Sequence, residues 1–550
     1  IFRYTGLDDL IRSTRIHCVP APTGWRECCA LYSIELPPGA HATVELEIAC
    51  LEEGKMTPRP ASGFVRAMRI ARCGLRQAQA AWPQIITDNE LFNQAITRSV
   101  ADLVMLVTDT EDGPYPYAGI PWFSTAFGRD AIITALQTMW LVPAMARGVL
   151  LYLAANQATE VNAAADSEPG KILHEVRHGE MALLGEVPFR RYYGSVDSTP
   201  LFVVLAGAYF ARTGDVETIR KLWPHVEAAI TWIDEFGDAD GDGFVEYGRR
   251  TAEGLINQGW KDSFDSIFHA DSSLARGPIA LSEVQAYVFA ARRAAADMAL
   301  ALGFKARGAT LSEQARVLRE KVEAAFWDDE LGLYVLALDG QKRPCRVAAS
   351  NAGHMLFAGL PDEARARVVA GRLVGRGFWT GWGIRTVASD AARYNPMSYH
   401  NGSVWPHDNT VIAAGFARYG LAGAAAKVLC GLFDTAMHTD LQRLPELFCG
   451  FPRMRNQGPT NYPVACSPQA WAAGALPGCL AACLGITFDP ADRTVRFNRP
   501  VLPEFLTRVR LQKIELCGAR IDILLHRTEA GAIAMAVTDR QGDIRAMMTS

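Results

Sequence analysis

The sequence predicts a mainly α protein, in which a helical toroid or solenoid lies between β-rich segments at the two ends of the chain. The first eighty or so residues, and those after about residue 487, alternate apolar and polar residues with the period of a strand. Some four hundred residues between them have the period of a helix. Loops dense in Gly, Trp, Tyr, Asp, Asn and His separate these helices, which is typical of a helical ring with its site on one rim.

The N-terminal segment, residues 1–80, predicts a partial β-sandwich-like domain. Residues 29–36 and 42–49 each place apolar residues mostly at every second position, and Pro-Pro-Gly-Ala makes a turn between them. We therefore expect these two segments to form a hairpin within an antiparallel sheet. The chain begins with Ile-Phe-Arg rather than with Met, so we interpret this domain as cut short at its N-terminus.

The middle segment, residues 85–486, carries helix signals along most of its length. Asp215 suits the N-cap of a helix with one apolar stripe, formed by Val216, Ile219, Leu222, Val226, Ile230 and Ile233. Thr310 and Glu313 match a capping box, and a second apolar stripe follows at Leu311, Ala315, Leu318, Val322 and Phe326.

The C-terminal segment, residues 487–550, returns to the strand period. Apolar and polar residues alternate over 494–497, 509–511, 521–525 and 532–537. We expect a strand at each of these places, and therefore a small β-rich segment after the helices.

Composition argues against several classes of function. The 55 Lys and Arg residues nearly balance the 59 Asp and Glu residues, for a net charge of -4, so nothing favours binding to nucleic acid or to an anionic membrane surface. No stretch reaches the roughly 18 uncharged apolar residues that a membrane-spanning helix needs. The 12 cysteines are sparse and form no Cys-x-x-Cys motif. We therefore expect a cytoplasmic protein with reduced thiols.

The first loop with candidate chemistry is PWFSTAFGRD, residues 121–130. Arg129 and Asp130 lie between an apolar helix and an aromatic cluster that contains Tyr115, Tyr117 and Trp122. A sugar ring stacks on an indole, while its neighbouring hydroxyls bind an arginine fork and a carboxylate. The pattern thus indicates sugar binding, although an N-capping Asp beside a surface Arg explains these residues equally well.

The second loop, residues 257–266, contains Asp262 and Asp265 beside Trp260 and Lys261. Either aspartate is a candidate general acid, because an apolar neighbour raises a carboxyl pKa whereas a cation lowers it. A helix-capping Asp-Ser pair is the structural alternative, and the spacing does not choose between the two aspartates.

The third loop, residues 394–409, reads YNPMSYHNGSVWPHDN and crowds polar and aromatic groups into sixteen residues. Such a set is costly to bury without a ligand or a dense hydrogen-bond network, which favours a functional role. The fourth loop places Glu446 between Leu, Pro and Phe. This glutamate is a candidate general base that activates a water, and the structural alternative is a solvated Glu at the mouth of a loop.

The segment His174-Glu175-Val-Arg-His178 matches the zinc-peptidase pattern HExxH, with Asp197 as a conceivable third ligand. However, Pro169-Gly170 precedes it and Gly179 follows at once, which leaves only about two turns of helix. We therefore treat a zinc-dependent hydrolase as the alternative to the main interpretation.

A second metal pattern is the opening of a calcium loop, in which Asp residues alternate before a glycine, here Asp238, Asp240 and Asp242. Position twelve of an EF-hand would be Arg249 instead of the bidentate Glu, although Glu246 could substitute for it. The structural alternative is a tight polar turn between helices.

Taken together, PWFSTAFGRD, GWKDS, YNPMSYHNGSVWPHDN and PELFCG, in this order, resemble the inverting glycoside hydrolases built on an (α/α)6 barrel. This superfamily includes glucoamylases, trehalases and the glucosidase domain of glycogen debranching enzymes. The chain is most similar to the bacterial amylo-α-1,6-glucosidases, or glycogen debranching enzymes, which carry a β domain before the barrel. The resemblance covers Tyr115 to Trp471 and implies a catalytic (α/α)6 barrel over residues 85–486.

Carried over residue by residue, the resemblance implies that Asp262 is the general acid and Glu446 the general base, with Asp265 as the reserve acid. Arg129 and Asp130 would hold hydroxyls of the terminal sugar. The other residues implied for the pocket are Trp122, Glu175, Arg177, Asp197, Trp260, His400, Asn401, Trp405 and Asp408. An inverting pair of carboxyls is about 6.5–9.5 Å apart, which leaves room for the attacking water.

The implied activity is that of an inverting, exo-acting α-glycosidase without a cofactor, which hydrolyses terminal α-linked glucose from oligosaccharides or glycogen-like glucans, including 1,6 branches. The chain has no room for the transferase barrel of two-activity debranching enzymes, so only the glucosidase step is expected. The superfamily also hydrolyses α-mannosides, glucosylglycerates and trehalose, which leaves the sugar and the linkage open. A glycan-binding toroid without turnover is the non-enzymatic alternative.

Overall fold

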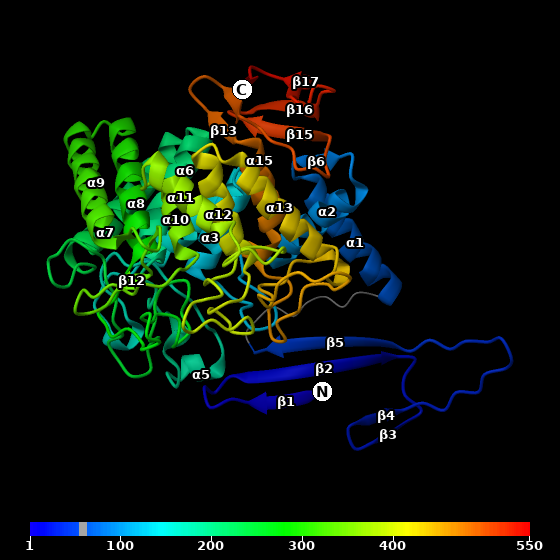
Figure 1. Ribbon diagram of the computed structural model, residues 1–550. Coiled ribbons are helices and arrows are strands. Elements are labelled where there is room, and N and C mark those ends of the chain that lie inside the picture. Colours follow the sequence, from blue (N-terminus) through cyan, green and yellow to red (C-terminus); the bar gives the residue numbers. More distant parts are fainter. Residues whose placement is uncertain (54–62, 550) are drawn as a thin grey trace. The chain divides into compact units, whose positions relative to one another are not determined.

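A computed structural model describes residues 1–53 and 63–549 of the chain. They form two compact units, one made of Ile1–Ala81 with His178–Arg190 and the other of Trp82–Arg177 with Arg191–Ser550. Helices occupy most of the middle of the chain, and strands lie toward both of its ends (Figure 1). The structure is therefore a mixed one, in which helices and sheets both contribute.

The smaller unit contains a three-stranded antiparallel sheet in the order β1-β2-β5. Its strands are β1 (Phe2–Thr5), β2 (Ile11–Val19) and β5 (Glu45–Glu52). The unit also holds a two-stranded sheet made of β3 (Gly24–Arg26) and β4 (Cys29–Leu31). Its three helical segments are α1 (Phe64–Ala80), α5 (Glu180–Leu183) and the 3-10 turn η2 (Pro188–Arg190).

The hairpin predicted between residues 29–36 and 42–49 is wrong. Strand β5 pairs with β2, so that Ile48 lies opposite Ile16, whereas β4 pairs with β3. Residues 32–36 belong to no strand. Alternation identifies a strand and its two faces, but it does not choose the partner of that strand.

Six helices of the larger unit form a closed ring of contacts, in which each contacts the next and the last contacts the first. In chain order they are α3 (Gly128–Thr138), α6 (Ser198–Thr213), α8 (Ser282–Ala301), α10 (Asn351–Ala358), α12 (Pro406–Arg418) and α15 (Ala475–Leu484), with one turn, α14 (Ala470–Ala473), before α15. These helices are buried on most sides. All residues of α3 except Leu136 are buried, for example, because ring helices have neighbours on several faces.

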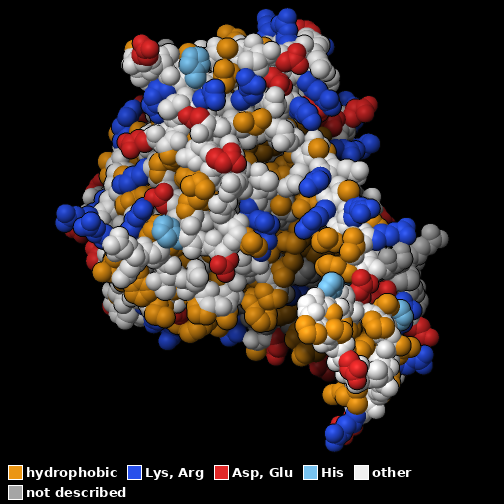
Figure 2. Space-filling model, turned by 90° about the vertical axis from the view of Figure 1, so that its right-hand side faces the viewer, with side chains coloured by type: hydrophobic (Ala, Val, Ile, Leu, Met, Phe, Trp, Pro, Cys, Tyr) orange, Lys and Arg blue, Asp and Glu red, His pale blue; other side chains and the backbone are white. Residues whose placement is uncertain are grey.

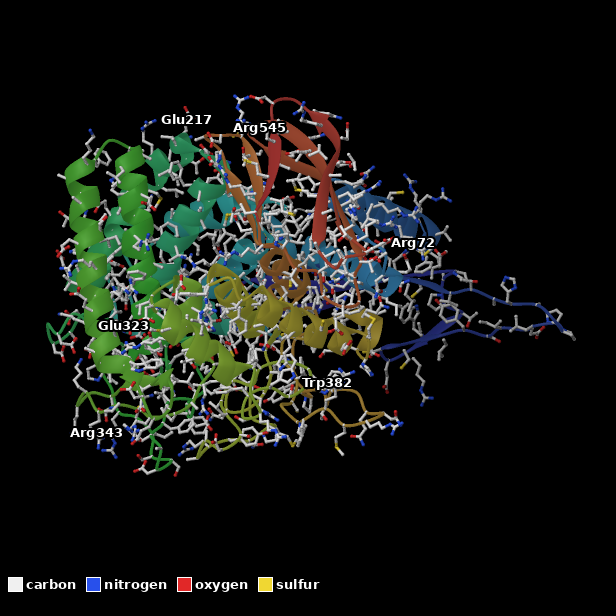
Figure 3. The ribbon with its side chains drawn as sticks, turned by 45° about the horizontal axis from the view of Figure 1, so that its top comes forward. Arg72, Glu217, Glu323, Arg343, Trp382 and Arg545 are labelled. Carbon is white, nitrogen blue, oxygen red and sulfur yellow. The ribbon has the colours of Figure 1, made fainter. Side chains whose placement is uncertain are left out.

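A second set of six helices packs against the ring. They are α2 (Glu90–Leu106), α4 (Pro143–Ala155), α7 (Val216–Glu235), α9 (Lys305–Phe326), α11 (Glu363–Leu373) and α13 (Ala422–Ala436). Each of the last five contacts the ring helix that precedes it, and α2 contacts α14 and α15. Glu323 of α9 (Figure 3) accepts a 2.8 Å hydrogen bond from the Tyr334 hydroxyl and forms an ion pair with Arg365 of α11. This contact ties two neighbouring helices of the second set together.

The two predicted helix starts have different outcomes. Asp215 caps α7 as predicted, since its Oδ1 accepts a 3.0 Å hydrogen bond from the backbone N–H of Thr218. The capping box at Thr310 is wrong, because α9 already begins at Lys305 and the Thr310 hydroxyl donates to the Ala306 carbonyl inside it. The apolar stripe predicted for this helix is confirmed, since all five of its residues are buried.

The strands after the helices belong to two sheets of the larger unit. A three-stranded sheet contains β13 (Ile486–Asp489), β14 (Thr494–Asn498) and β18 (Arg545–Thr549). A four-stranded sheet in the order β17-β16-β15-β6 contains β17 (Ile533–Gln541), β16 (Ala519–Arg527), β15 (Arg508–Leu516) and β6 (Gln84–Thr87). The expected strands are therefore present, and β15 pairs with β6, a strand that precedes α2.

The remaining elements are short and lie in the loops between helices. They include three two-stranded sheets: β7 (Val107–Thr110) pairs with β8 (Gly113–Pro116), β9 (Ala280–Leu281) with β12 (Ala337–Leu338), and β10 (Trp327–Asp328) with β11 (Leu333–Tyr334). Two 3-10 turns are η1 (Ala163–Ala165) and η3 (Asp440–Gln442). These elements help to order the long loops that carry the candidate site.

Two surface properties agree with the composition. Lys and Arg side chains are interspersed with Asp and Glu side chains over the face drawn in Figure 2. Within residues 1–53 and 63–549, no helix combines the length and the apolar character that crossing a bilayer demands.

Candidate functional site

The predicted site residues of the larger unit lie at one end of the ring helices. Arg129 is the second residue of α3, Asp197 immediately precedes α6, and Asp262 lies in the loop before α8. His400 lies in the loop before α12, and Glu446 in the loop before α14. Segments that are far apart in the sequence thus meet at the N-terminal ends of these helices.

Arg129 is buried and joins two aspartates from different loops. Its Nη1 donates hydrogen bonds of 3.1 and 3.2 Å to the carboxylate of Asp197, and its Nη2 donates one of 3.2 Å to Oδ2 of Asp262. The Ser195 hydroxyl donates a further hydrogen bond of 2.7 Å to Asp197. Asp197 is therefore fully paired, whereas Asp262 receives only one hydrogen bond from this guanidinium.

Asp262 has the properties expected of a group that exchanges a proton. Its side chain is 30% exposed, so a ligand can reach it. Burial raises the pKa of Asp262 to about 6, Arg129 opposes that rise and the negative charge of Asp197 adds to it. The backbone carbonyl of Asp265 accepts a 3.1 Å hydrogen bond from Asn401. Of the two aspartates of this loop, Asp262 is the one that forms an ion pair with Arg129.

Glu446 is 2% exposed, and both of its oxygens accept hydrogen bonds. The Tyr399 hydroxyl donates to Oε1 at 2.6 Å, and the backbone N–H of Cys466 donates to Oε2 at 2.9 Å. Burial raises the pKa of Glu446 to about 7, these two hydrogen bonds oppose the rise, and the charge of Asp262 adds to it. The carboxyl is thus held in one orientation and is within electrostatic reach of Asp262.

Asp130 is a third buried carboxyl in the same electrostatic group. Its Oδ1 accepts a 3.1 Å hydrogen bond from the side chain of Gln469. Burial raises the pKa of Asp130 to about 7, Arg129 opposes the rise, and the charges of Glu446 and Asp262 both add to it. Three carboxyls that repel one another favour a state in which at least one of them is protonated near neutral pH.

Glu175, Arg177 and Trp122 form a connected group. Nε of Arg177 donates a 2.7 Å hydrogen bond to Glu175, and its Nη1 donates one of 2.9 Å to the Trp122 carbonyl. The Trp122 side chain is 55% exposed, and its indole N–H donates to the carbonyl of Val464. Burial raises the pKa of Glu175, and Asp262 contributes to this shift. The group therefore lies near the acidic cluster and presents an exposed indole.

The aromatic residues predicted to line the pocket are mostly buried beneath it. Trp260 packs edge-on against His400, Trp405 and His407, and it stacks on His354. Nδ1 of His400 lies 2.7 Å from the Ser263 hydroxyl, next to Asp262 in sequence. This cluster therefore supports the loop that carries Asp262.

Asp408 was predicted to line the substrate pocket, but its side chain is fully buried. Its Oδ1 is 2.7 Å from Nε2 of His354, and both side chains are buried. His354 also bonds to the Tyr287 hydroxyl, and buried Lys261 donates 2.6 Å hydrogen bonds to Asn351 and to the carbonyl of Thr386. The structure thus places Asp408 in a buried polar network below the site.

The zinc interpretation is wrong. Residues 174–178 form no helix, so the two histidines do not share a helix face, and Glu175 instead makes isolated bridges to Phe127 and Tyr192. His174 is buried between the rings of Phe127 and Tyr192. The glycines and the proline around this segment explain why it does not become helical.

The acidic turn proposed as a calcium loop already has a cation. Nζ of Lys342 lies 3.0 Å from Asp240 and 2.7 Å from Asp242, and it also contacts Glu246. Asp238, Asp240 and Asp242 are close enough to share an ion. The lysine ammonium nevertheless balances much of their charge, which favours the polar-turn alternative over a calcium loop.

Sequence reasoning did not identify three partners of the acidic groups, which are Tyr399, Gln469 and the backbone of Cys466. Tyr399 lies inside the third loop motif, so its position was a signal for a site residue. Gln469 and Cys466 lie in a segment without any motif. Only the fold brings them to Asp130 and Glu446.

Two comparisons with known proteins, one with family models and one with single proteins, both point to mannosylglycerate hydrolases. Residues 125–449 match the model of the Mannosylglycerate hydrolase MGH1-like glycoside hydrolase domain. The chain is 32% identical over 104 residues to the mannosylglycerate hydrolase of Thermus thermophilus. That alignment covers 19% of this chain and 25% of the relative, so it spans about a quarter of the relative's length.

Solved structures show a similar fold. The Thermus thermophilus mannosylglycerate hydrolase, solved with Tris, has a TM-score of 0.53 at 17% identity, over 70% of this chain and 99% of that chain. A rhamnosidase of Bacillus has a TM-score of 0.61 at 17% identity, over 85% of this chain but only 42% of that chain. The matching family is named after mannosylglycerate hydrolase, so these comparisons give no support to glycogen debranching in particular.

Proposed function

Because the chain belongs to the family of Mannosylglycerate hydrolase MGH1-like glycoside hydrolase domains, we propose that it hydrolyses a terminal α-linked hexose of a small glycoside with inversion. One observation carries this proposal. Asp262 and Glu446 come from separate loops and both have a raised pKa; the charge of Asp262 raises the pKa of Glu446, and both charges raise the pKa of Asp130. A pair of such carboxyls is the machinery that glycoside hydrolysis needs.

Glu446 is assigned as the general base. The backbone N–H of Cys466 can only donate, so it requires an oxygen with a free lone pair, and the Tyr399 hydroxyl is placed to donate to the other oxygen. These hydrogen bonds favour the ionised form, which is the form that takes a proton from water. A pKa of about 7 makes this carboxylate a stronger base than an ordinary glutamate.

Asp262 is assigned as the general acid. It is the more exposed of the two carboxyls, so the glycosidic oxygen of a bound substrate can approach it. With a pKa of about 6 it retains its proton in part of the molecules at mildly acidic pH. Arg129 fixes its direction through one oxygen and leaves the other for the substrate.

The surrounding residues suit a sugar with a small polar partner. Asp130 and Arg129 place an acceptor and donors beside the two proposed catalytic groups, which matches neighbouring hydroxyls. Trp122 offers an exposed indole for stacking, and Arg177 places a cation beside it. A mannosyl or glucosyl glycerate is therefore our first candidate substrate, since its glycerate carboxylate would pair with a guanidinium.

We also infer that the larger unit is an (α/α)6 barrel. Six helices contact one another in a closed ring, and six more pack against them, each paired with a ring helix. The predicted extent of the barrel, residues 85–486, and of the β-rich segment that begins at residue 487 remain part of this proposal. The barrel supports the assignment of the site because both proposed catalytic residues lie at the same end of the ring.

The test is hydrolysis of a panel of α-glycosides, followed by NMR of the first product anomer. The panel contains mannosylglycerate, glucosylglycerate, trehalose and a 1,6-branched dextrin, the last because of the ordered motifs. We expect β-sugar first from an α-linked substrate. Asp262→Asn and Glu446→Gln should each lower kcat at least 100-fold, whereas Asp265→Asn in the same loop serves as the matched control and keeps activity within about threefold.

Three outcomes overturn parts of the proposal. Initial release of α-sugar refutes inversion. Full activity of either carboxyl variant refutes its catalytic role. Binding of a glycoside by calorimetry without any release of sugar on long incubation refutes hydrolysis and favours a glycan-binding toroid.

A further inference from the structure

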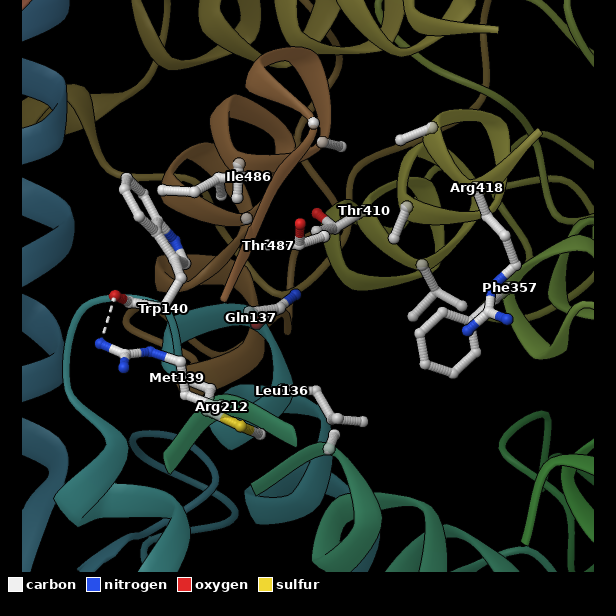
Figure 4. A pocket seen from close by; sticks show the side chains of 18 of the residues that line it. Leu136, Gln137, Met139, Trp140, Arg212, Phe357, Thr410, Arg418, Ile486 and Thr487 are labelled. Carbon is white, nitrogen blue, oxygen red and sulfur yellow. Dashed lines mark hydrogen bonds between the residues drawn. The ribbon is translucent and has the colours of Figure 1, made fainter. Parts of the chain in front are cut away.

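A cavity of about 690 Å³ lies at the ends of the ring helices opposite to the proposed catalytic residues. Its lining comes from α3, α6, α10, α12 and α15, mostly from their C-terminal parts, and from β13 (Figure 4). Arg129 lies at the start of α3, whereas the cavity is lined by residues from Ile133 onward and by Met139 and Trp140 beyond its end. The volume is within the range of pockets that hold small molecules.

The wall of this cavity is largely apolar. It includes aliphatic, thioether and aromatic side chains, among them Ile133, Leu136, Met139, Phe357, Val411 and Phe488. Apolar surface of this kind gains free energy when a hydrocarbon replaces water against it. A ligand for the cavity therefore has a substantial apolar body.

A buried arginine lines the same cavity. Arg212 is 6% exposed, its Nη2 donates hydrogen bonds to the carbonyls of Trp140 at 3.3 Å and Glu515 at 2.7 Å, and its guanidinium lies 3.6 Å from the ring centre of Phe488. Its Nε is buried without a hydrogen-bond partner among the described residues, and burial lowers the pKa of Arg212 to about 10 although the charge of Glu515 opposes this shift. Burial of a cation with so little compensating charge is costly, and an anion from outside would relieve that cost.

Two further polar groups line the cavity. Arg418 at the end of α12 is exposed, and Figure 4 shows it on the side of the cavity away from Arg212. The indole N–H of Trp140 is buried and has no acceptor among residues 1–53 and 63–549. The cavity thus offers donors and positive charge but no carboxylate to balance them.

We propose that this cavity is a binding site for an amphiphilic carboxylate, whose apolar chain lies against the wall and whose anionic head is balanced by Arg212, next to the indole N–H of Trp140, which is unpartnered among the described residues. The site is separate from the proposed glycoside site, because the cavity residues touch none of the acidic groups assigned to catalysis. A medium-chain fatty acid such as decanoate has the required chemistry, since it combines one carboxylate with a flexible hydrocarbon chain. An uncharged alcohol of equal length has the chain without the head.

The test is isothermal titration calorimetry of the full chain with decanoate below its micelle concentration, and with decanol. We expect saturable binding of decanoate at one site, and binding of decanol at least tenfold weaker. Arg212→Met and the cavity-filling Ala414→Phe should each weaken decanoate at least tenfold. Arg510→Met removes an exposed arginine of β15 that does not line the cavity, and this matched control should bind like the unaltered chain.

Other results overturn the proposal. Absence of saturable decanoate binding refutes the site, and unchanged binding in Ala414→Phe shows that any binding occurs elsewhere. Equal affinities for decanoate and decanol, or unchanged affinity in Arg212→Met, refute the role of Arg212. Circular dichroism of each variant establishes that it is folded. The measurement does not depend on turnover, so a failure of the proposed glycoside activity leaves its result intact.

Discussion

The hydroxyl of Tyr399 donates a 2.6 Å hydrogen bond to Oε1 of Glu446, and Tyr399 lies only one residue before His400. The same tyrosine ring packs against Trp405 and Tyr462. The loop that carries most of the aromatic motif therefore also positions the proposed base. A substitution of this single hydroxyl tests the assignment without removing any carboxylate.

In Tyr399→Phe, the pKa of Glu446 should rise, because the lost hydrogen bond favours the ionised carboxylate. The base must be ionised to act, so a smaller share of Glu446 is in its active form and kcat/KM at pH 6 should fall about tenfold. A pH profile of kcat/KM measures this fall. Tyr462→Phe is the matched control, since Tyr462 packs on Tyr399 but donates no described hydrogen bond to Glu446. An unchanged kcat/KM at pH 6 would contradict the role of Glu446 as base.

In Asp197→Asn, the pKa of Asp262 should fall, because Asp197 contributes a negative charge that raises it. The acid must be protonated to act, so kcat/KM at pH 8 should fall about tenfold for each unit by which the pKa of Asp262 falls. A pH series from the same assay detects the change, with Asp265→Asn as the variant in which kcat/KM at pH 8 is unchanged. A rise of kcat/KM at pH 8 would contradict the role of Asp262 as acid, because the loss of Asp197 and the freeing of Arg129 both favour its ionised form.

Phe92→Ala should destabilise the larger unit by about 3–5 kcal/mol, since a fully buried ring is removed from the core. Phe92 of α2 packs against Phe433 and Phe505, with ring centres 5.2 and 5.3 Å apart. Leu91→Ala is the neighbouring control, because Leu91 is 52% exposed and its loss should change stability by at most about 0.5 kcal/mol. Urea unfolding followed by fluorescence compares the two, and equal values would contradict the packing described for α2.

Chelation should leave the stability of the protein unchanged, because Lys342 supplies the cation of the acidic turn. The midpoint of thermal unfolding should be the same in excess EDTA and in millimolar CaCl2, since a bound ion would raise it. Lys342→Met should lower the midpoint, because Glu246 is then buried without its partner. A rise of the midpoint with calcium in the unaltered chain would show that the ion displaces the lysine.

Local patterns predicted the local features of this fold. The stripe that ends at Phe326 and the cap at Asp215 follow from contacts within one helix, so the sequence contains their causes. The box at Thr310 failed because threonine also bonds to a carbonyl four residues earlier inside a helix. Single-element signals are therefore reliable for the existence of a helix and less so for its first residue.

Long-range pairings were beyond the reach of these patterns. The alternation around Ile48 does not reveal that its strand pairs with β2, and nothing near Thr87 indicates a partner after residue 500. The loops around Arg129 and Asp262 were both chosen from their chemistry, but their contact, and that of Asp130 with Gln469, depends on the closure of the ring. The sequence therefore identified candidate residues of the site, but not which of them contact one another.

The pairing of β6 with β15 has a consequence for synthesis of the chain. Thr87 lies opposite Val509, so more than 400 residues must be made before the first strand of the larger unit meets its neighbour. The contact of α15 with α3 imposes a similar delay on the ring. A nascent chain that ends before β15 therefore exposes apolar helix surface and an unpaired strand, which makes this interval the one in which a chaperone would have most to protect.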